Sequence, residues 1–352
     1  MNFLVLIKCF GVVLGGCCFV ANLFAQIPPG YYDDAEGLYG DELREALHQI
    51  IQGHTVITNS EIWTAFESTD MKPDGTVWDM YSDIPGGQPA YIYEFVTDQC
   101  GNYSQEGDCF NREHSFPQSW YGSAAPMSTD LFHIYPTDGF VNGVRANYPY
   151  GSVGVANFTT TNGSLRGTSN WTGYSGIVFE PIDEYKGDFA RTFFYMLTRY
   201  YPQISQWQTD MLEGDDFTVW ARDILLLWAA DDPVSQKEID RNNAVYAIQG
   251  NRNPFIDMPE FAVDVWDETV GVKPEAQESA FRMWYSSDFV WLDGTTENVQ
   301  LEIFDSSGRI LIQAYPDGGC LQVGHLPAGM YIVRGGGADL YGASTMKFVK
   351  IK

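Results

Sequence analysis

The spacing of apolar residues changes near residue 269, and this change constrains the fold more than any other feature of the chain. Before it, several stretches have the pattern and end signals of amphipathic helices. Beyond it, apolar and polar residues alternate as in short strands. The expected helices are Asp41–Gln52, Asp188–Tyr201, Phe217–Ala230, Ser235–Gln249 and Pro259–Glu268. The expected strands are Val299–Phe304, Arg309–Ala314, Met330–Arg334 and Thr345–Ile351.

These two patterns predict an α+β protein built from two parts. Residues 26–268 would form one large domain, residues 269–280 a linker, and residues 281–352 a small β-sandwich. The segments 54–110 and 148–176 are rich in turn-forming residues, so we expect loops there, with short strands as the alternative in the second. With 352 residues, of which 45% are hydrophobic, the chain can bury a substantial core.

The first 25 residues have the pattern of a secretory signal peptide. Lys8 supplies positive charge, Phe10 to Phe24 are mostly apolar, and Ala25 before Gln26 is a plausible cleavage point. The apolar run is short for a membrane span. A lipoprotein processing box at 14–17 (Leu-Gly-Gly-Cys) is the alternative. Either way, the chain is expected to leave the cytoplasm.

Residues 111–119 read Asn-Arg-Glu-His-Ser-Phe-Pro-Gln-Ser, and Val-Asn-Gly-Val-Arg follows at 141–145. Carboxylate and amide oxygens, here Glu113 and Asn142, are hard ligands suited to Mg²⁺. A neutral histidine such as His114 can accept a proton from water near pH 7. Together these groups suit metal-assisted cleavage of a phosphodiester. The alternative is that Glu113-His114 is a chance dipeptide whose histidine serves structure.

The order Arg-Glu-His-x-x-Pro-Gln-Ser, then Asp-Leu-Phe-His-Ile-Tyr-Pro at 130–136, then Val-Asn-Gly-x-Arg-x-Asn at 141–147 resembles the endonuclease I family. These are secreted bacterial nucleases built on a ββα-metal finger, also called the His-Me finger. A second match is Gln-Gly-Asn-Arg-Asn-Pro-Phe-Ile-Asp at 249–257, and the likeness extends over residues 26–268.

The resemblance implies a role for each matching residue. His114 would be the general base, while Glu113 and Asn142 would hold a divalent cation, Mg²⁺ by preference with Mn²⁺ or Ca²⁺ as alternatives. The cation would stabilise the transition state and the leaving oxygen. Arg145 is predicted to act in catalysis. Arg112, His133 and Arg252 are predicted to bind substrate, although a salt-bridged arginine or a structural histidine is the alternative at each position.

Backbone geometry adds two expectations about this site. Successive side chains of a regular strand point to opposite faces, so Glu113 and His114 must lie at a strand end or a bulge if they share a cavity. Asn142 would open the helix of the finger, and an ordinary N-cap is the alternative explanation for an asparagine there.

Three cysteines remain after the predicted signal peptide. Cys100 and Cys109 lie just before the candidate site, where a disulfide would pin the loop that leads into Glu113 in an oxidising compartment. Cys320 is left over. The alternative is that all three are free thiols.

The C-terminal part carries its own resemblance. Leu-Glu-Ile-Phe-Asp-x-x-Gly-Arg at 301–309, Leu-Pro-Ala-Gly-Met-Tyr-Ile-Val at 326–333 and Lys-Phe-Val-Lys-Ile at 347–351 resemble the sorting domain of the type IX secretion system. That resemblance implies a β-sandwich read by the secretion machinery in the outer membrane. A carbohydrate-binding or adhesive module is the alternative, because small antiparallel domains look alike in sequence.

The sequence thus predicts a metal-dependent endonuclease that reaches the cell surface or the medium through the periplasm. Its substrate would be DNA, with RNA as an alternative, cut with low sequence specificity to leave 5′-phosphates; no stable protein partner is implied. The formal net charge of −26 is the strongest evidence against this, because nucleic-acid binders are usually basic. The competing hypothesis is a surface adhesive protein that retains the fold without activity.

Overall fold

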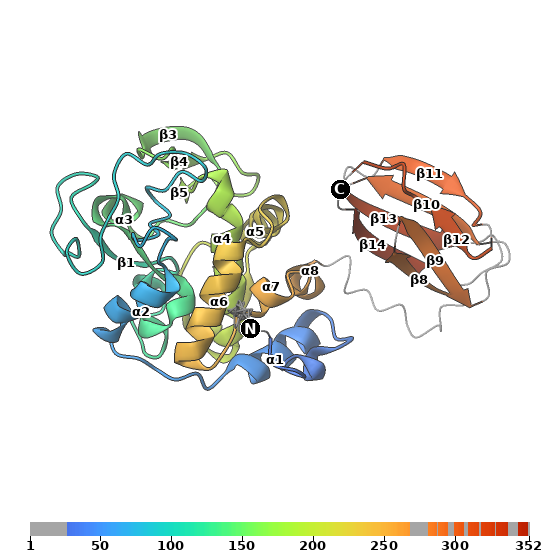
Figure 1. Cartoon of the computed structure of the whole chain (residues 1–352), viewed down its shortest axis with the longest axis horizontal. Coiled ribbons are helices and arrows are strands. Elements are labelled where there is room, and N and C mark those ends of the chain that lie inside the picture. Colours follow the sequence, from blue (N-terminus) through green and yellow to red (C-terminus); the bar gives the residue numbers. More distant parts are fainter. Residues whose placement is uncertain are drawn as a thin grey trace, which may run out of the picture. The chain divides into compact units, whose positions relative to one another are not determined.

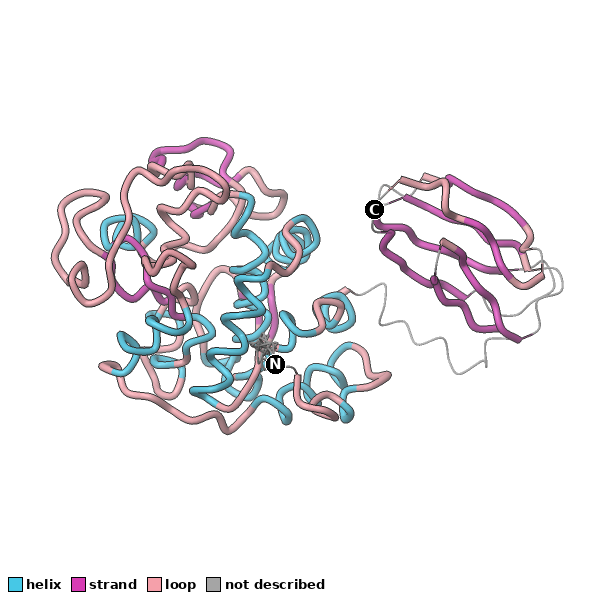
Figure 2. Tube along the Cα trace, viewed as in Figure 1, coloured by secondary structure: helices cyan, strands magenta, loops and turns pink. Residues whose placement is uncertain are grey.

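The computed structural model describes residues 27–267, 281–286, 288–294, 299–305, 309–316, 318–327, 329–336 and 344–350. The chain divides into two compact units, residues 1–271 and 272–352. The first combines helices with small sheets and the second consists of strands, so the predicted α+β class is confirmed (Figures 1 and 2). The predicted signal peptide and linker lie outside the described residues. Within the described ranges, no helix has the length and apolar character needed to cross a bilayer.

Helix α4 (Lys186–Arg199) is the central element of the first unit. All its residues from Gly187 onward are buried, and it packs against α1 (Gly40–Ile51), α5 (Val219–Asp231) and α7 (Pro254–Asp257). Sequence periodicity predicted three of these four helices to within about two residues. The exception, α7, is a single turn that begins at a proline after an Asn253 cap.

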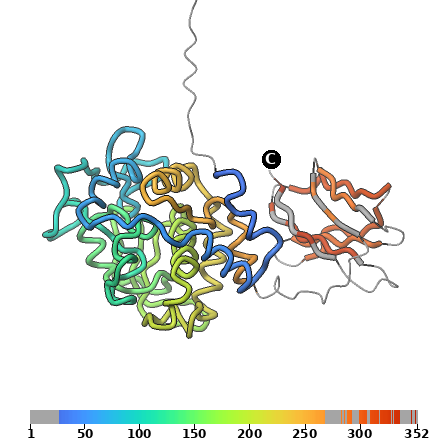
Figure 3. Tube along the Cα trace, turned by 90° about the horizontal axis from the view of Figure 1, so that it is seen from below, coloured from blue at the N-terminus to red at the C-terminus, as the bar shows by residue number. Residues whose placement is uncertain are grey.

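Helix α6 (Gln236–Gln249) begins at the serine cap that the sequence predicted. The Ser235 hydroxyl accepts from the Glu238 backbone N–H, and the Glu238 carboxylate accepts from the Ser235 N–H, which completes a capping box. Beyond α6, the last helix of the unit, α8 (Phe261–Trp266), is shorter than expected. The extended segment between α1 and α2 crosses one side of the unit, where Thr55 N donates to Gln249 O over 2.7 Å (Figure 3).

Residues 54–110 are rich in loops, as expected, but they also contain α2 (Glu61–Thr69), which the sequence did not predict. Its buried residues Ile62, Ala65, Phe66 and Thr69 are spaced as on one face of a helix, and that face packs on α6. Turn residues farther along the segment, such as those at 72–75, obscured this nine-residue stretch.

Residues 148–176 contribute strands, as the alternative allowed. Strands β3 (Val153–Thr159), β4 (Leu165–Ser169) and β5 (Ile177–Glu180) form an antiparallel sheet. Strands β6 (Leu212–Glu213) and β7 (Asp216–Phe217) pair as a short hairpin. Short 3-10 helices complete the unit: η1 (Asp33–Ala35), η2 (Gln118–Trp120), η3 (Met127–Thr129), η4 (Leu131–His133), η5 (Asp183–Tyr185) and η6 (Tyr201–Gln206).

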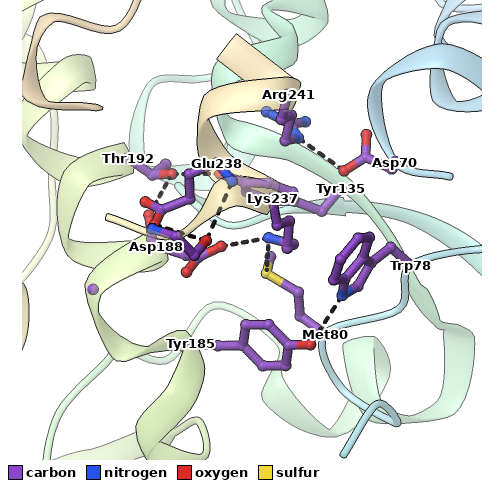
Figure 4. Close-up of polar contacts among 12 residues, drawn as sticks. Asp70, Trp78, Met80, Tyr135, Tyr185, Asp188, Thr192, Lys237, Glu238 and Arg241 are labelled. Atoms are coloured by element: carbon purple, nitrogen blue, oxygen red, sulfur yellow. Dashed lines mark hydrogen bonds and ion pairs between the residues drawn. The ribbon is translucent and has the colours of Figure 1, made fainter. Parts of the chain in front are cut away.

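Buried ion pairs join α6 to α4 and to Asp70, the residue that ends α2. Lys237 donates to Asp188, Arg191 pairs with Glu238, and Arg241 Nε lies 2.8 Å from Asp70 Oδ1 (Figure 4). The Lys237 ammonium also lies 5.3 to 5.9 Å from the centroids of three aromatic rings, those of Trp78, Tyr135 and Tyr185. Arginines are concentrated in the interior of this unit: Arg44, Arg145, Arg191, Arg199, Arg241 and Arg252 are buried.

The second unit is an antiparallel β-sandwich. One sheet has the order β11-β10-β13-β14 and the other β12-β9-β8. Val290, Leu301, Ile303, Val323 and Val333 are wholly buried in one apolar cluster between them. The four predicted strands correspond to β10 (Gln300–Asp305), β11 (Ile310–Ala314), β13 (Gly329–Gly336) and β14 (Ser344–Lys350). The sequence did not predict β8 (Phe281–Ser286), β9 (Phe289–Gly294) or β12 (Cys320–Gln322).

Candidate active site

The motif residues lie on a ββα unit. Strand β1 (Phe110–His114) pairs antiparallel with β2 (Ile134–Asp138), and α3 (Gly139–Arg145) follows β2 directly and packs on both strands. His114 is the last residue of β1, which confirms that the Glu113-His114 pair lies at a strand end. His114 still pairs with Ile134 of β2, and β1 ends immediately after it.

Asp138 caps α3, so the expectation that Asn142 opens the helix was wrong. The Asp138 Oδ1 accepts from Val141 N over 2.8 Å, while its Oδ2 accepts from Tyr93 OH and Gly107 N. Asn142 lies one turn inside the helix. There its Nδ2 donates to Asn111 Oδ1 over 2.7 Å and approaches Arg112 O at 3.4 Å. The amide is thus held against β1 through its nitrogen, and no described residue donates to its oxygen.

Glu113 is buried, with 1% of its surface exposed. Its Oε1 accepts from Tyr81 OH at 3.0 Å and from Arg145 Nη1 at 2.9 Å, and Tyr150 OH donates in turn to Tyr81 at 2.7 Å. Burial raises the pKa of Glu113, and the Arg145 guanidinium opposes that shift. Within the part of the chain that the structure describes, no group donates to Oε2. One carboxylate oxygen is therefore fixed by protein and the other keeps its capacity to accept.

The surroundings of His114 define its tautomer. Its Nε2 lies 3.1 Å from Ser128 O, which can only accept, so Nε2 carries the proton and Nδ1 is the basic nitrogen. The Gln118 amide nitrogen lies 3.1 Å from Nδ1 and 2.9 Å from Nε2. Burial, with a further contribution from His133, lowers the pKa of His114 to about 3 and keeps the imidazole neutral at pH 7.

The structure contradicts direct substrate contact by Arg145 and His133, because protein encloses both. Arg145 is 0% exposed, and besides Glu113 it donates to the carbonyls of His114 (3.1 Å) and Ser115 (2.6 Å). His133 is also 0% exposed; its Nε2 donates to Met127 O, and its ring centroid lies 5.5 Å from that of His114. Arg145 therefore positions Glu113, and the His133 ring packs edge-on against the ring of His114.

Arg252 is likewise a structural residue, contrary to the predicted role in substrate binding. It is buried, and its guanidinium pairs with Asp257 through Nε (2.6 Å) and Nη2 (2.7 Å). Neighbours in the same motif also pack internally: Asn251 donates to Ile51 O and Tyr195 OH. The motif at 249–257 thus joins α6, α7 and the end of α1.

Two arginines beside the ββα unit keep part of their surface exposed. Arg112 of β1 donates to both oxygens of Asn59 at 2.7 Å and lies 4.9 Å above the Trp63 ring. Arg166 of β4 donates to Val144 O over 3.1 Å. Val144 lies two residues beyond Asn142 in α3. The partial exposure of Arg112 leaves its predicted role in substrate binding open to test, and Arg166 is a further arginine close to this unit.

The predicted disulfide between Cys100 and Cys109 is present. The loop that it closes is tied to α3, because Gly107 N donates to Asp138 and Gly139 N donates to Cys109 O. Tyr103 of the loop packs directly on the helix: a Cβ at Gly143 would lie 2.5 Å from its hydroxyl. Glycine at 143 therefore permits the loop to pack beside Asn142.

Comparison with known proteins identifies the family. The family model described as Endonuclease I matches residues 39–260. The chain belongs to the endonuclease I family. It is 34% identical over 247 residues to the extracellular ribonuclease of Bacillus amyloliquefaciens, covering 67% of this chain and 78% of the relative. It is 23% identical over 240 residues to an extracellular deoxyribonuclease of Aeromonas hydrophila, covering 61% and 86%. The expectation of a nuclease is confirmed with the family.

The site of this endonuclease I family member suits one hard divalent cation. Among the described residues, no group of three or more His, Cys, Asp or Glu could hold a metal. The candidate donors are instead one carboxylate oxygen of Glu113 and the amide oxygen of Asn142, to which no described residue donates a hydrogen bond. Mg²⁺ commonly takes one or two protein oxygens and completes its shell with water and phosphate, so this donor set fits it.

Sequence reasoning gave no role to several residues of the family member's site. Gln118 stands in the motif only four residues from His114, a spacing that could have indicated contact. Ser128, Tyr81 and Tyr150 lack a local signal. Ser128 reaches His114 and Tyr81 reaches Glu113 through one hydrogen bond each, and Tyr150 acts only through Tyr81.

Proposed function

We propose that this protein is a secreted, metal-dependent endonuclease that hydrolyses phosphodiester bonds of DNA or RNA with low sequence specificity. One observation carries the proposal. In the side chains of Glu113 and Asn142, one polar atom is hydrogen-bonded to protein and the other is not. Glu113 Oε2 and Asn142 Oδ1 lack protein donors, on adjacent elements of one ββα unit whose first strand ends at His114. Relatives named extracellular ribonuclease and extracellular deoxyribonuclease support both the substrate class and secretion.

In this mechanism His114 Nδ1 accepts a proton from the attacking water. The water oxygen forms a bond to phosphorus, the bond from phosphorus to the 3′ oxygen breaks, and that oxygen takes a proton from solvent, leaving a 5′-phosphate and a 3′-hydroxyl. The Ser128 carbonyl holds the proton on Nε2 and thereby keeps Nδ1 basic. In the free protein the Gln118 amide nitrogen lies at Nδ1, and the attacking water would take its place there.

Glu113 and Asn142 would hold the cation, which supplies charge stabilisation at the phosphate and the leaving oxygen. We propose Mg²⁺, with Mn²⁺ or Ca²⁺ as alternatives. Tyr81 and Arg145 fix the Glu113 carboxylate in the required orientation. Arg112 and Arg166 would contact phosphates, because a guanidinium matches phosphate oxygens in charge and geometry.

The β-sandwich would direct export. Its strands carry the sequence patterns that resemble the sorting domain of the type IX secretion system, and a separately packed module suits recognition by a transporter. We therefore propose the type IX machinery as the one protein partner of the chain, with the route to the cell surface or medium passing through the periplasm.

Cleavage of supercoiled plasmid, with Mg²⁺ or with EDTA, tests the proposed activity. We expect nicking only with Mg²⁺, and we expect His114→Ala to lower the cleavage rate by about 10²- to 10⁴-fold while Mg²⁺ binding persists, since it removes the base but no ligand. His325→Ala is the matched control, because His325 is exposed in the other unit. Absence of metal-dependent nicking would instead favour the adhesive alternative.

A further inference from the structure

Asn111 of β1 lies beside the candidate cation ligands and has no role in the proposed chemistry. It is two residues before Glu113, so the two side chains leave the strand on the same face. Arg145 of α3 donates to Glu113 Oε1 over 2.9 Å. Asn142, about one turn earlier in the helix, donates from Nδ2 to Asn111 Oδ1 over 2.7 Å. Two side-chain links therefore join the strand to the helix, and each involves one of the two candidate ligands.

The backbone of β1 determines which end of the Asn142 amide faces the strand. Asn142 Nδ2 also lies 3.4 Å from Arg112 O. A backbone carbonyl can only accept, so a reversed amide would place its oxygen against the oxygen of Arg112. The nitrogen therefore faces the strand and the oxygen faces away from it. A contact of 3.4 Å is weak, so the shorter bond to Asn111 is the one that holds the amide in this orientation.

Protein partly shields the bond between the two asparagines from water. Both side chains are half-buried. Tyr103, from the loop that the disulfide closes, lies over α3 next to them: a Cβ placed at Gly139 would be 2.7 Å from Tyr103 Cδ1 and 3.3 Å from Asn111 Nδ2. A hydrogen bond in such surroundings is electrostatically stronger than one at an open surface. The Asn142 amide is thus held before any ion arrives.

We propose that Asn111 is a positioning residue for the divalent cation, because it fixes the Asn142 amide with Oδ1 available to the ion. The inference deepens the proposed nuclease function and rests on it for the presence of the cation. Without an acceptor at position 111 the Asn142 amide can rotate, and its NH₂ group, which is not a ligand, would then face the ion in part of the population. Partners that orient a metal ligand typically contribute about 10- to 100-fold to metal affinity or activity.

Mn²⁺ binding in the absence of nucleic acid tests the proposal, with the electron paramagnetic resonance signal of the free ion as the measurement. Glu113→Gln gives the background of ions held elsewhere on this acidic chain. Asn111→Ala removes the acceptor and should raise the dissociation constant of the site by about tenfold. Asn111→Asp keeps an acceptor for the Asn142 NH₂ group and should bind Mn²⁺ at least as tightly as the wild type. Wild-type affinity in Asn111→Ala, or equal losses in both variants, would overturn the proposal.

A double-mutant cycle separates positioning from direct coordination. In an Asn142→Ala background the oriented ligand is already absent, so Asn111→Ala should cause no further loss of Mn²⁺ affinity. A further loss of about tenfold in that background would make Asn111 itself a ligand and would refute the positioning role. Asn170→Ala, the same change at an exposed position after β4, is the matched control and should leave Mn²⁺ binding unchanged.

Plasmid cleavage over a range of Mg²⁺ concentrations distinguishes this proposal from the nuclease function itself. We expect Asn111→Ala to need about ten times more Mg²⁺ for its half-maximal rate and to approach the wild-type rate at saturation, because the base and both ligands remain. Metal-dependent cleavage with unchanged Mn²⁺ affinity in Asn111→Ala rejects the positioning role but retains the nuclease. The expected order of Mn²⁺ affinities without any cleavage retains the positioning role and rejects the nuclease.

Discussion

Glu113 and Glu238 share burial and an arginine partner but differ in how their carboxylate oxygens are used. Each is buried, with exposed fractions of 1% and 3%, and each pairs with a buried arginine. At Glu238 both oxygens accept hydrogen bonds: Oε1 from Arg191 Nε, and Oε2 from Arg191 Nη2 (2.9 Å) and Ser235 N (2.8 Å). At Glu113 both protein donors use Oε1.

The difference shows that burial and ion pairing alone do not identify a metal ligand. Both properties are shared by a carboxylate that joins two helices and by one in the candidate site. Glu113 Oε2 has no donor among the described residues but is not a fully buried oxygen, so water or a cation can reach it. The unsatisfied oxygen is therefore the feature that distinguishes the candidate ligand from the structural residue.

The same substitution at both positions tests this distinction most strongly. Glu113→Gln keeps an acceptor for Tyr81 and Arg145 but replaces the other oxygen with an NH₂ group, so we expect Mg²⁺-dependent cleavage to fall about a thousandfold. At Glu238 both oxygens accept hydrogen bonds, so the NH₂ group of a glutamine would face a donor whichever way the amide is turned. Glu238→Gln should therefore lower the free energy of unfolding by about 3 kcal/mol and spare cleavage. Plasmid cleavage and urea unfolding of both variants measure the two effects. Equal losses of cleavage in both would refute the distinction.

Asp79 tests the comparison between Glu113 and Glu238, because one of its oxygens accepts a hydrogen bond and the other is buried without one. Its Oδ1 accepts from Tyr81 N over 2.8 Å, while its Oδ2 is buried without a partner, and burial raises the pKa of this carboxyl to about 7. Its pKa in the unfolded chain is lower, so ionisation destabilises the folded state as the pH rises from about 4 to 7.

Asp79→Asn should remove that pH dependence. Relative to the variant, the wild-type protein is expected to lose up to about 4 kcal/mol of unfolding free energy between pH 4 and pH 7. Urea unfolding at several pH values measures it, with exposed Asp231→Asn as the control. Parallel pH profiles for wild type and Asp79→Asn would show that an unsatisfied buried oxygen carries no such cost here.

The smallest expected effect concerns the covalent loop beside the site. Replacing Cys100 and Cys109 with serine should lower the unfolding free energy by about 2 kcal/mol, because the closed loop is short. Hydrogen exchange should accelerate in α3, against which Tyr103 packs, and remain unchanged in α6. Reduced wild-type protein should behave in the same way; uniform acceleration in both helices would mean that the loop stabilises the whole unit rather than the site.

Local patterns predicted much of this structure. The Ser235 cap and apolar periodicity gave four helices nearly to their ends, and residues 111–114 gave the core of the candidate site. The functional assignment of arginines and of His133 was less successful, because burial depends on tertiary packing. Arg145 and Arg252 match family motifs as well as Arg112 does, yet they lie inside the protein with carboxylate partners. The contributions of Tyr81, Tyr150 and Ser128 could not be predicted for the same reason.

The enclosure of so many guanidinium groups has a consequence for encounters with substrate. With six of the nine arginines of the first unit buried and a formal net charge of −26, the protein approaches a polyanion as a like-charged body. Ionic strength then acts in the opposite sense from its effect on a basic nuclease, since dissolved ions shorten the range of the repulsion and speed the first collision. An enzyme with this charge is expected to hold uncut strands only briefly, and moderate salt is expected to favour its encounters with them.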